Sequence, residues 1–320
     1  MKLMLKLCAL TVLVLMAGQA LAQTWPARPV RIVIAFAPGG PLEVVRPVAI
    51  KLQEALGQPF VIDYKAGGNS VIGGDFVAKA PADGYTLLTF TSSFTINPST
   101  QKSLPYDTVK DFTTVSFLAR GDIILTVNPA VPARNLNELI ALARSQPGKL
   151  NFASSGTGGA LHLAGELLKM VAGVDMIHVP YKGAGPATAD VVAGNANLAF
   201  LSMPPSVPMI KSGRLRIIGV ASLKRTTTFP DVPTLDEQGL AKFEVASFYG
   251  VTARAGVPRP VITRLNESMQ KILVMDEIRQ AFNNSGVEPW AMPQNEQQAW
   301  LEQEIEKWQK VTRAIKYQPE

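Results

Sequence analysis

Two short glycine-rich segments carry the residues best suited to holding a ligand. The first follows an apolar run that ends at Phe36, and it reads Pro38-Gly39-Gly40-Pro41 ahead of a helix-compatible pattern. Glycines let a ligand come close to the backbone, and a proline suits the first helical position because its missing N–H would have no intrahelical partner. The segment therefore predicts a strand, a tight turn and a helix N-terminus, where free N–H groups favour an anion.

A second copy of this arrangement lies in the middle of the chain. A strand-like run beginning at Leu150 leads into Ser154-Ser155-Gly156-Thr157-Gly158-Gly159, and a helical pattern starts at Ala160. Taken alone, this segment is equally consistent with a plain turn at a helix start. Because two such turns occur in separate halves of the chain, we expect a cleft that holds an acid from both sides.

The hydroxyl side chains near these turns have two interpretations. Ser92 and Ser93 follow a strand-like run, and Ser154 and Ser155 open the second turn. The chain has no G-x-S-x-G segment, which is typical of one large class of serine hydrolases. We therefore interpret these serines as neutral hydrogen-bond donors in a binding cleft. A hydrolase that uses a cleft serine with His162 remains the alternative from another functional class.

Neither a metal nor a nucleotide cofactor is expected. The only histidines, His162 and His178, fall on different predicted elements without ligand spacing. His162 either points at a bound anion or packs locally. The Gly156–Gly159 segment fails the dinucleotide pattern because its third glycine position is Leu161, and no Gly-Lys-Ser/Thr follows.

The first 22 residues have the pattern of an export signal. Lys2 and Lys6 precede the apolar stretch Leu7–Met16, and Ala20-Leu21-Ala22 is a small-residue cleavage site. The alternative, a membrane anchor, fits less well because the stretch is short. The only cysteine, Cys8, lies inside this signal, so the mature chain would have neither disulfides nor thiol chemistry. These features predict a periplasmic protein.

Cleavage after Ala22 leaves residues 23–320, a length that suits two domains of about 150 residues each. The formal net charge of +6 becomes +4 when the two signal lysines are lost. Basic residues are interspersed with acidic ones, so no nucleic-acid partner is expected, while a mild positive field attracts small anions.

Strand-like and helix-like patterns alternate along the chain, which predicts an α/β fold. Two segments punctuated by Gly and Pro, Leu118–Pro129 and Phe243–Gly256, look like crossings between lobes. We therefore place lobe one at 23–124 and 247–320, and lobe two at 125–246. Pro47 falls inside the first helical pattern, so that helix either bends or begins its regular part later. The expected strands are Val30–Phe36, Phe60–Tyr64, Thr86–Phe90, Ile123–Val127, Asn151–Ala153, Met176–Val179, Leu198–Leu201 and Ile217–Ala221, and the expected helices include Leu42–Leu56, Leu136–Ser145, Ala160–Val171, Ala184–Ala193, Pro258–Leu273 and Glu296–Thr312.

Several short motifs, in this order and spacing, resemble the substrate-binding receptors of tripartite tricarboxylate transporters, also called Bug-type periplasmic receptors. The resemblance covers essentially the whole mature chain. The matching segments are Trp25–Arg31, Phe36–Gly40, Val77–Ala80 with Asp83–Leu88, Tyr106–Phe112, His162–Glu166, His178–Gly183 and Phe229–Thr234.

This resemblance implies a two-lobed type II periplasmic-binding fold that closes around a small organic acid. It further implies that backbone amides of the two glycine-rich turns hold one carboxylate, with membrane transporter subunits as partners. We expect a monomer; a ligand-presenting accessory of a signalling system is a second alternative. The candidate ligand-binding residues are Phe36, Pro38, Gly39, Gly40, Pro41, Leu42, Glu43, Ser92, Ser93, Ser154, Ser155, Gly156, Thr157, Gly158, Gly159, His162, Leu201 and Ser202.

Two departures from the family pattern bear on the ligand. Where the family commonly has Gly-Thr-Asp after its Gly-Gly, this chain has Pro41-Leu42-Glu43, and where an Asp-Asn pair is frequent it has Leu201-Ser202. If Leu42 and Leu201 line the cleft, they favour one carboxylate attached to an apolar or aromatic body over citrate or an amino acid. The alternative for Leu201 is packing in the core of lobe two.

Overall fold

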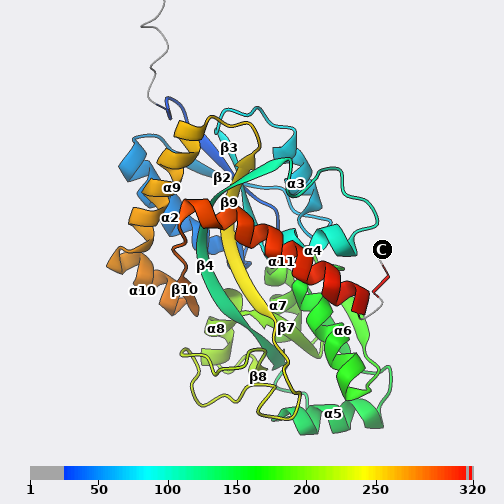
Figure 1. The fold of residues 1–320 in the computed structure, drawn as a ribbon. Helices are drawn as coiled ribbons and strands as arrows, with labels where there is room; N and C mark the ends of the chain where they lie inside the picture. The colour runs from blue at the N-terminus through cyan, green and yellow to red at the C-terminus, as the bar shows by residue number, and fades with distance from the viewer. Residues whose placement is uncertain (1–24, 315–316, 319–320) are drawn as a thin grey trace, which may run out of the picture.

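Figure 1 shows the computed structural model of the chain, which describes residues 25–314 and 317–318. The expected signal peptide, residues 1–22, and its Cys8 lie outside the described residues. The strands are β1 (Val30–Ile34), β2 (Phe60–Tyr64), β3 (Thr86–Thr91), β4 (Phe112–Val127), β5 (Asn151–Ser154), β6 (Ile177–Pro180), β7 (Leu198–Ser202), β8 (Arg216–Val220), β9 (Ala246–Arg254) and β10 (Val287–Pro289). The helices are η1 (Pro41–Val44), α2 (Val45–Leu56), α3 (Val71–Ala78), α4 (Ser92–Thr100), α5 (Leu136–Ser145), α6 (Ala160–Ala172), α7 (Ala184–Ala193), α8 (Met203–Lys211), α9 (Arg259–Leu273), α10 (Asp276–Asn284) and α11 (Gln294–Ala314).

The strands form a continuous path in the order β2-β1-β3-β9-β4-β7-β5-β6, with β10 and β8 paired to β4. The long strand β4 changes partners along its length. Its residues Phe112–Asp122 pair with β9, and Ile123–Val127 pair with β7. We call the strands on the first side of this change, with their helices, lobe one, and those on the second side lobe two. The backbone thus passes between the lobes on β4 and β9 (Figure 1).

Within each lobe, the strands that precede helices run parallel. Strands β2, β1 and β3 are parallel in lobe one, and β6, β5 and β7 are parallel in lobe two. In a parallel arrangement the carboxyl ends of the strands, and the N-termini of the helices that follow them, lie at one edge of the sheet. That edge of each lobe supplies the loops of the site described below.

Apolar side chains on both faces of the sheet form the cores. In lobe one, Ile32, Ile34 and Leu52 are almost fully buried, and in lobe two Phe152 and Phe200 are. The last helix, α11, runs diagonally from one lobe to the other in Figure 1. Its Trp300 packs against Phe117 of lobe one, while Trp308 joins the main core cluster of lobe two. The C-terminal helix therefore connects the lobes a third time, by packing.

The first helical region settles the question raised by Pro47. Residues Pro41–Val44 form a single 3-10 turn, and the regular helix α2 begins at Val45. Pro47 is then the third residue of α2, where its missing N–H would have had no partner within that helix. The regular part of this helix thus starts later than the hydrophobic pattern does.

Candidate functional site

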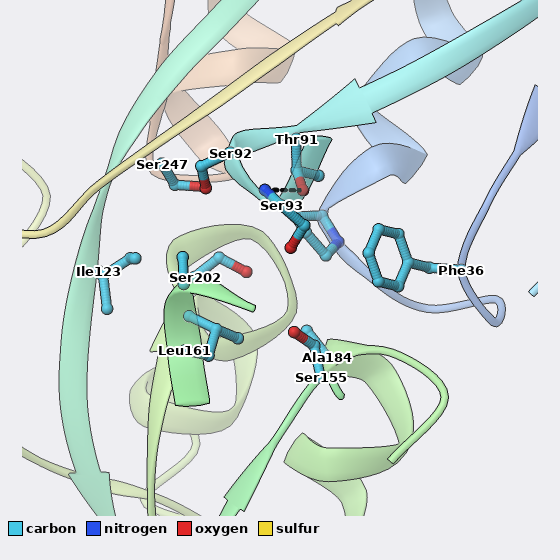
Figure 2. Close-up of a pocket in the computed structure, with 12 residues that line it drawn as sticks. Phe36, Thr91, Ser92, Ser93, Ile123, Ser155, Leu161, Ala184, Ser202 and Ser247 are labelled. Atoms are coloured by element: carbon cyan, nitrogen blue, oxygen red, sulfur yellow. Dashed lines mark hydrogen bonds between the residues drawn. The ribbon is translucent and has the colours of Figure 1, made fainter. Parts of the chain in front are cut away.

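A small cavity lies where β4 and β9 pass between the lobes. Its volume is about 30 Å³, enough for one or two water-sized groups. Both lobes contribute to its wall, as Figure 2 shows. The lining residues are Phe36, Pro41, Thr91, Ser92, Ser93, Ile123, Ser155, Ala160, Leu161, Ala184, Ser202 and Ser247.

Four helices begin at the wall of this cavity. Ser92 and Ser93 start α4, Ala160 and Leu161 start α6, Ala184 starts α7, and Ser202 is the N-cap of α8. The first N–H groups of a helix have no intrahelical acceptor, and the helix dipole places positive potential at that end. The N-caps of α6 and α7 are glycines, which have no capping side chain, and the side chain of Ser202 at α8 accepts no capping hydrogen bond. The cavity is thus surrounded by the ends of helices that favour a negative charge.

Hydroxyl groups add further hydrogen-bonding capacity. Six lining residues carry one, and in Figure 2 those of Ser93, Ser155 and Ser202 point toward a shared space. The Thr91 hydroxyl accepts from the N–H of Ser93 at 3.2 Å and so caps α4. The Ser202 hydroxyl is buried with no partner in hydrogen-bonding geometry. It does lie close enough to the Tyr249 hydroxyl to lower the pKa of Tyr249, against the larger rise that burial causes. A buried hydroxyl without a partner lowers the stability of the folded protein, so the Ser202 hydroxyl is available to hydrogen-bond a ligand or a water.

The wall of the cavity offers no cationic side chain to an anion. Among the described residues, none that lines it is charged, and its remaining wall is apolar, formed by residues such as Phe36, Ile123 and Leu161. Recognition must then come from hydroxyls, backbone N–H groups and helix dipoles. The N–H groups and helix dipoles are fixed in direction, so they select the geometry of the anion as well as its charge.

The first glycine turn is held by its own acidic residue. One oxygen of Glu43 accepts from the N–H of Gly39 at 3.1 Å and from the Tyr64 hydroxyl at 2.7 Å, and the other pairs with Arg46. Burial raises the pKa of Glu43, but hydrogen bonds from Tyr64, Arg46 and Gly39 outweigh this and lower the pKa overall. Glu43 is therefore ionised and paired within lobe one, and the N–H of Gly39 donates to it instead of to a ligand.

The second glycine turn is held from behind by two histidines. The N–H of Gly158 donates to Nδ1 of His162 at 2.9 Å, and Ser154 Oγ lies 2.6 Å from Nε2 of His178. Ser154 Oγ also accepts from the N–H of Gly156 at 3.2 Å. These bonds shape the turn but use two of the N–H groups that we expected to meet a ligand.

The two lobes touch closely beside the cavity. The N–H of Ala37 in lobe one donates to the carbonyl of Lys182 in lobe two at 2.9 Å, and Gln101 Nε2 donates to the Thr157 carbonyl at 3.4 Å. Gly156 and Thr157 line a neighbouring cavity of about 260 Å³ that shares Phe36 and Ser155 with the first. The conformation described is therefore one in which the lobes are in contact.

The structure brings some of the predicted site residues to the cavity and places others behind it. Those that line it are Phe36, Pro41, Ser92, Ser93, Ser155 and Ser202. Gly39, Gly40 and Glu43 line a separate surface hollow. The remaining candidates, including Pro38, Ser154, Gly158, Gly159 and His162, form or support the turns without lining the cavity.

The two leucines on which the ligand argument rested are in the cores. Leu42 is 2% exposed within the lobe-one core, and Leu201 is fully buried among apolar residues of lobe two. The interpretation of both as cleft residues is therefore wrong: side chains alternate across β7, and the side chain of Ser202, not that of Leu201, reaches the cavity. The apolar part of the cavity wall comes instead from Phe36, Ile123 and Leu161.

Sequence reasoning missed Thr91, Ile123, Ala160, Leu161, Ala184 and Ser247 as lining residues. The sequence carried a signal for four of these residues, because Thr91 directly precedes Ser92 and because Ala160, Leu161 and Ala184 open two predicted helices. Ser247 was not, because its strand β9 was not predicted.

One serine–histidine contact in the structure bears on the hydrolase alternative. Ser154 Oγ and His178 Nε2 are within hydrogen-bonding distance, but Ser154 is fully buried and lines no part of the cavity. His162 is also buried, with its Nδ1 engaged by Gly158. Among the described residues, no group of three His, Cys, Asp or Glu side chains is placed to hold a metal ion.

The chain is similar to known proteins along most of its length. Residues 44–317 match the model of the tripartite tricarboxylate transporter family receptor. The chain belongs to this family. Over 300 residues the receptor is 35% identical to the protein BugT of Bordetella pertussis, covering 93% of this chain and 92% of BugT.

Solved structures confirm the predicted α/β periplasmic-binding fold of the receptor. Rpa4515 of R. palustris, determined with adipate, is 34% identical with a TM-score of 0.89, covering 92% of this chain and 100% of that one. MatC from Rhodopseudomonas palustris, with bound malate, is 28% identical with a TM-score of 0.86, covering 90% and 99%. In the part of the receptor that the structure describes, no helix has the length and apolar character needed to span a membrane.

Proposed function

We propose that the receptor binds a small organic carboxylate in the periplasm and delivers it to the membrane subunits of a tripartite tricarboxylate-type transporter. The observation that carries the proposal is the cavity at which four helices begin and which six hydroxyl-bearing residues line. Adipate and malate, the ligands of two similar proteins, both carry carboxylates. The receptor acts as a monomer, cleaved after Ala22, and performs no chemistry on its ligand.

We further propose that the ligand has one carboxylate in this cavity and an apolar or aromatic body. Phe36, Ile123 and Leu161 support this, because each places apolar surface beside the hydroxyl groups. Burying such surface contributes about 25 cal/mol per Å², and each charge-assisted hydrogen bond about 1.5–3 kcal/mol. A second charge lodged against the apolar wall would lose its hydration without gaining a partner.

Closure of the lobes is the remaining part of the proposal. The lobes, 23–124 with 247–320 and 125–246, would move about the crossings on β4 and β9. A ligand that contacts Ser93 in lobe one and Ser155 in lobe two favours the closed arrangement, because only there can it reach both.

A thermal-shift screen of carboxylates, followed by calorimetry, tests the function. The panel contains benzoate, hexanoate, octanoate, adipate, malate, citrate and aspartate. A ligand present at about 100 times its Kd adds about 2.7 kcal/mol to the free energy of unfolding, which is a readily measured rise in Tm. Recovery of unchanged ligand after incubation supports a receptor, whereas turnover of matching esters supports the hydrolase alternative.

A further inference from the structure

Two imidazoles are stacked directly behind the second glycine turn. The ring centroids of His162 and His178 are 3.8 Å apart, with their planes 16° from parallel. Phe152 extends the stack, 4.9 Å from His178. His162 comes from α6 and His178 from β6, so the stack joins the helix that begins at the cavity to the strand at the sheet edge.

Each imidazole contacts the turn through one nitrogen. Nδ1 of His162 accepts from the N–H of Gly158, so this nitrogen must be unprotonated. Nε2 of His178 contacts Ser154 Oγ, which in turn accepts from the N–H of Gly156. The pair therefore fixes both glycines of the turn whose conformations have positive φ, 139° at Gly156 and 76° at Gly158.

The surroundings favour two neutral rings. Nε2 of His162 lies 3.7 Å from a Glu166 oxygen, but Lys169 already pairs with that carboxylate at 3.0 Å. The Tyr317 ring packs edge-on against His162. Burial lowers the pKa of His162 to about 4, helped by Lys169, and burial together with His162 lowers the pKa of His178 to about 4. Two protonated rings at this separation would repel each other strongly.

We propose that His162 and His178 are positioning residues for ligand binding, and that as a stacked neutral pair they hold the Ser154–Gly159 turn in its binding shape and release it when protonated. This inference rests on the proposed function, since it concerns the same site. Protonation converts Nδ1 of His162 from an acceptor into a donor that faces the Gly158 N–H. The turn must then move away, and with it the adjoining Ser155 and the start of α6. The receptor therefore loses its ligand in acid.

The first test needs no ligand. The receptor has only two histidines, so the histidine side-chain nitrogen resonances in an NMR spectrum report on this pair alone. We expect His162 to be the Nε2–H tautomer at pH 7, both rings to titrate well below 6.5, and the Gly158 amide resonance to move with them. A His162 Nδ1–H tautomer, ordinary titration near 6.5, or a Gly158 resonance indifferent to the titration would overturn the proposal.

The second test uses hexanoate, a single carboxylate on an apolar chain, as the probe in calorimetry. His162→Asn keeps an acceptor near the position of Nδ1 but cannot be protonated, and His178→Gln does the same near Nε2. We expect the double variant to bind hexanoate within about threefold of the wild type at pH 7, and His162→Leu, which lacks the acceptor, to bind at least tenfold more weakly. Equal binding by His162→Leu would overturn the proposal.

Acid supplies the decisive comparison. Because hexanoate itself titrates, the quantity measured is the ratio of wild-type to double-variant Kd at pH 7 and at pH 4. Since rings with a pKa of about 4 are about half protonated at pH 4, we expect this ratio to rise about two- to fourfold in acid, and an unchanged ratio would overturn the proposal. If no carboxylate binds the wild type at pH 7, the proposed function fails while the NMR titration still decides the role of the histidines.

Discussion

Gly185 of lobe two faces Pro38 of lobe one with no space for a side chain between them. A Cβ built on Gly185 would stand 2.6 Å from the carbonyl oxygen of Pro38 and 2.8 Å from the carbonyl carbon of Gly39. Both are backbone atoms, which have little freedom to withdraw. Because Pro38 precedes the turn at η1 and Gly185 lies in the first turn of α7, this contact limits how closely the lobes approach beside the cavity.

Replacing Gly185 with valine should therefore prevent full closure. The backbone at Gly185 has no positive φ, but Pro186 follows it within α7, so valine also adds local strain and binding is measured on protein shown to be folded. We expect weaker binding by at least tenfold, and a larger radius of gyration in small-angle scattering with ligand present than the wild type has. Ala189→Val, on an exposed position of the same helix, is the control. Wild-type affinity in Gly185→Val would show that ligand binding does not depend on this contact between the lobes.

Two glycines at opposite ends of α6 form a matched pair for testing the second turn. Gly158 and Gly173 both have positive φ, so alanine costs about 1–2 kcal/mol of stability at either. Only at Gly158 would the new Cβ meet the other lobe, 2.8 Å from Thr100 Oγ1, whereas Gly173 has open space. We expect Gly158→Ala to abolish binding and Gly173→Ala to leave it unchanged, measured by calorimetry on folded protein. Equal affinities would remove this turn from the site.

The Ser202 hydroxyl should contribute more to ligand affinity than to the stability of the free receptor. Its buried hydroxyl has no partner in hydrogen-bonding geometry, so Ser202→Ala costs the free receptor little stability. Losing one hydrogen bond of about 1.5–3 kcal/mol to a charged ligand weakens binding by about 10- to 150-fold. Denaturant unfolding and calorimetry separate the two effects. Ser212→Ala, at the exposed end of the same helix, is the control, and a loss of stability without loss of affinity would contradict the assignment.

The apolar wall should set the order of ligands. We expect benzoate, hexanoate or octanoate to bind more tightly than citrate, malate and aspartate. We expect Leu161→Asn to reduce this difference in affinity, because asparagine offers a hydrogen-bond partner to a polar ligand. Leu201→Asp, in contrast, places a carboxylate in a fully buried position and should unfold the receptor instead of changing its preference. Tight binding of citrate by the wild type would refute the proposed ligand class.

The stability of the receptor should fall in mild acid. His162 has a folded-state pKa of about 4, below the unfolded value of about 6.5, so the unfolded chain binds more protons between these pH values. Stability is therefore complete above about pH 6.5 and declines as the pH falls toward 4, by about 3 kcal/mol for His162 alone. Denaturant midpoints measured across this range in the wild type and His162→Asn should diverge as the pH falls.

Sequence patterns identified many of the elements, including α6 and α7, two of the four helices that begin at the cavity. Strand Phe60–Tyr64 and helices Leu136–Ser145 and Ala184–Ala193 agree with the expected bounds, because each is periodic and bounded by turn residues. The signal failed for β9, whose run Ala246–Arg254 mixes Ser, Tyr, Gly and Thr and is buried on both faces. It also failed for α8, because Pro204, Pro205 and Pro208 mask a helix with proline in its first turn.

For the site, sequence located the turns but not the direction in which side chains point. The glycine turns and Ser92, Ser93, Ser155 and Ser202 were expected, yet neighbours such as Leu201 face the opposite side of the same strand. The internal bonds of Glu43 to Gly39 and of His162 to Gly158 join residues four apart, but nothing in a residue pattern says whether such a pair faces its own turn or a ligand. That distinction needs the packed structure.

The most direct test is calorimetry of the carboxylate panel against the wild type and the Ser93→Ala/Ser202→Ala double variant. Ser93 and Ser202 contribute hydroxyls to the cavity from different lobes. We predict that at least one carboxylate with an apolar body binds the wild type and that the double variant, still folded, binds it at least 50-fold more weakly. Binding of no carboxylate by the wild type, or equal binding by both proteins, would contradict the assignment of this cavity as the carboxylate site.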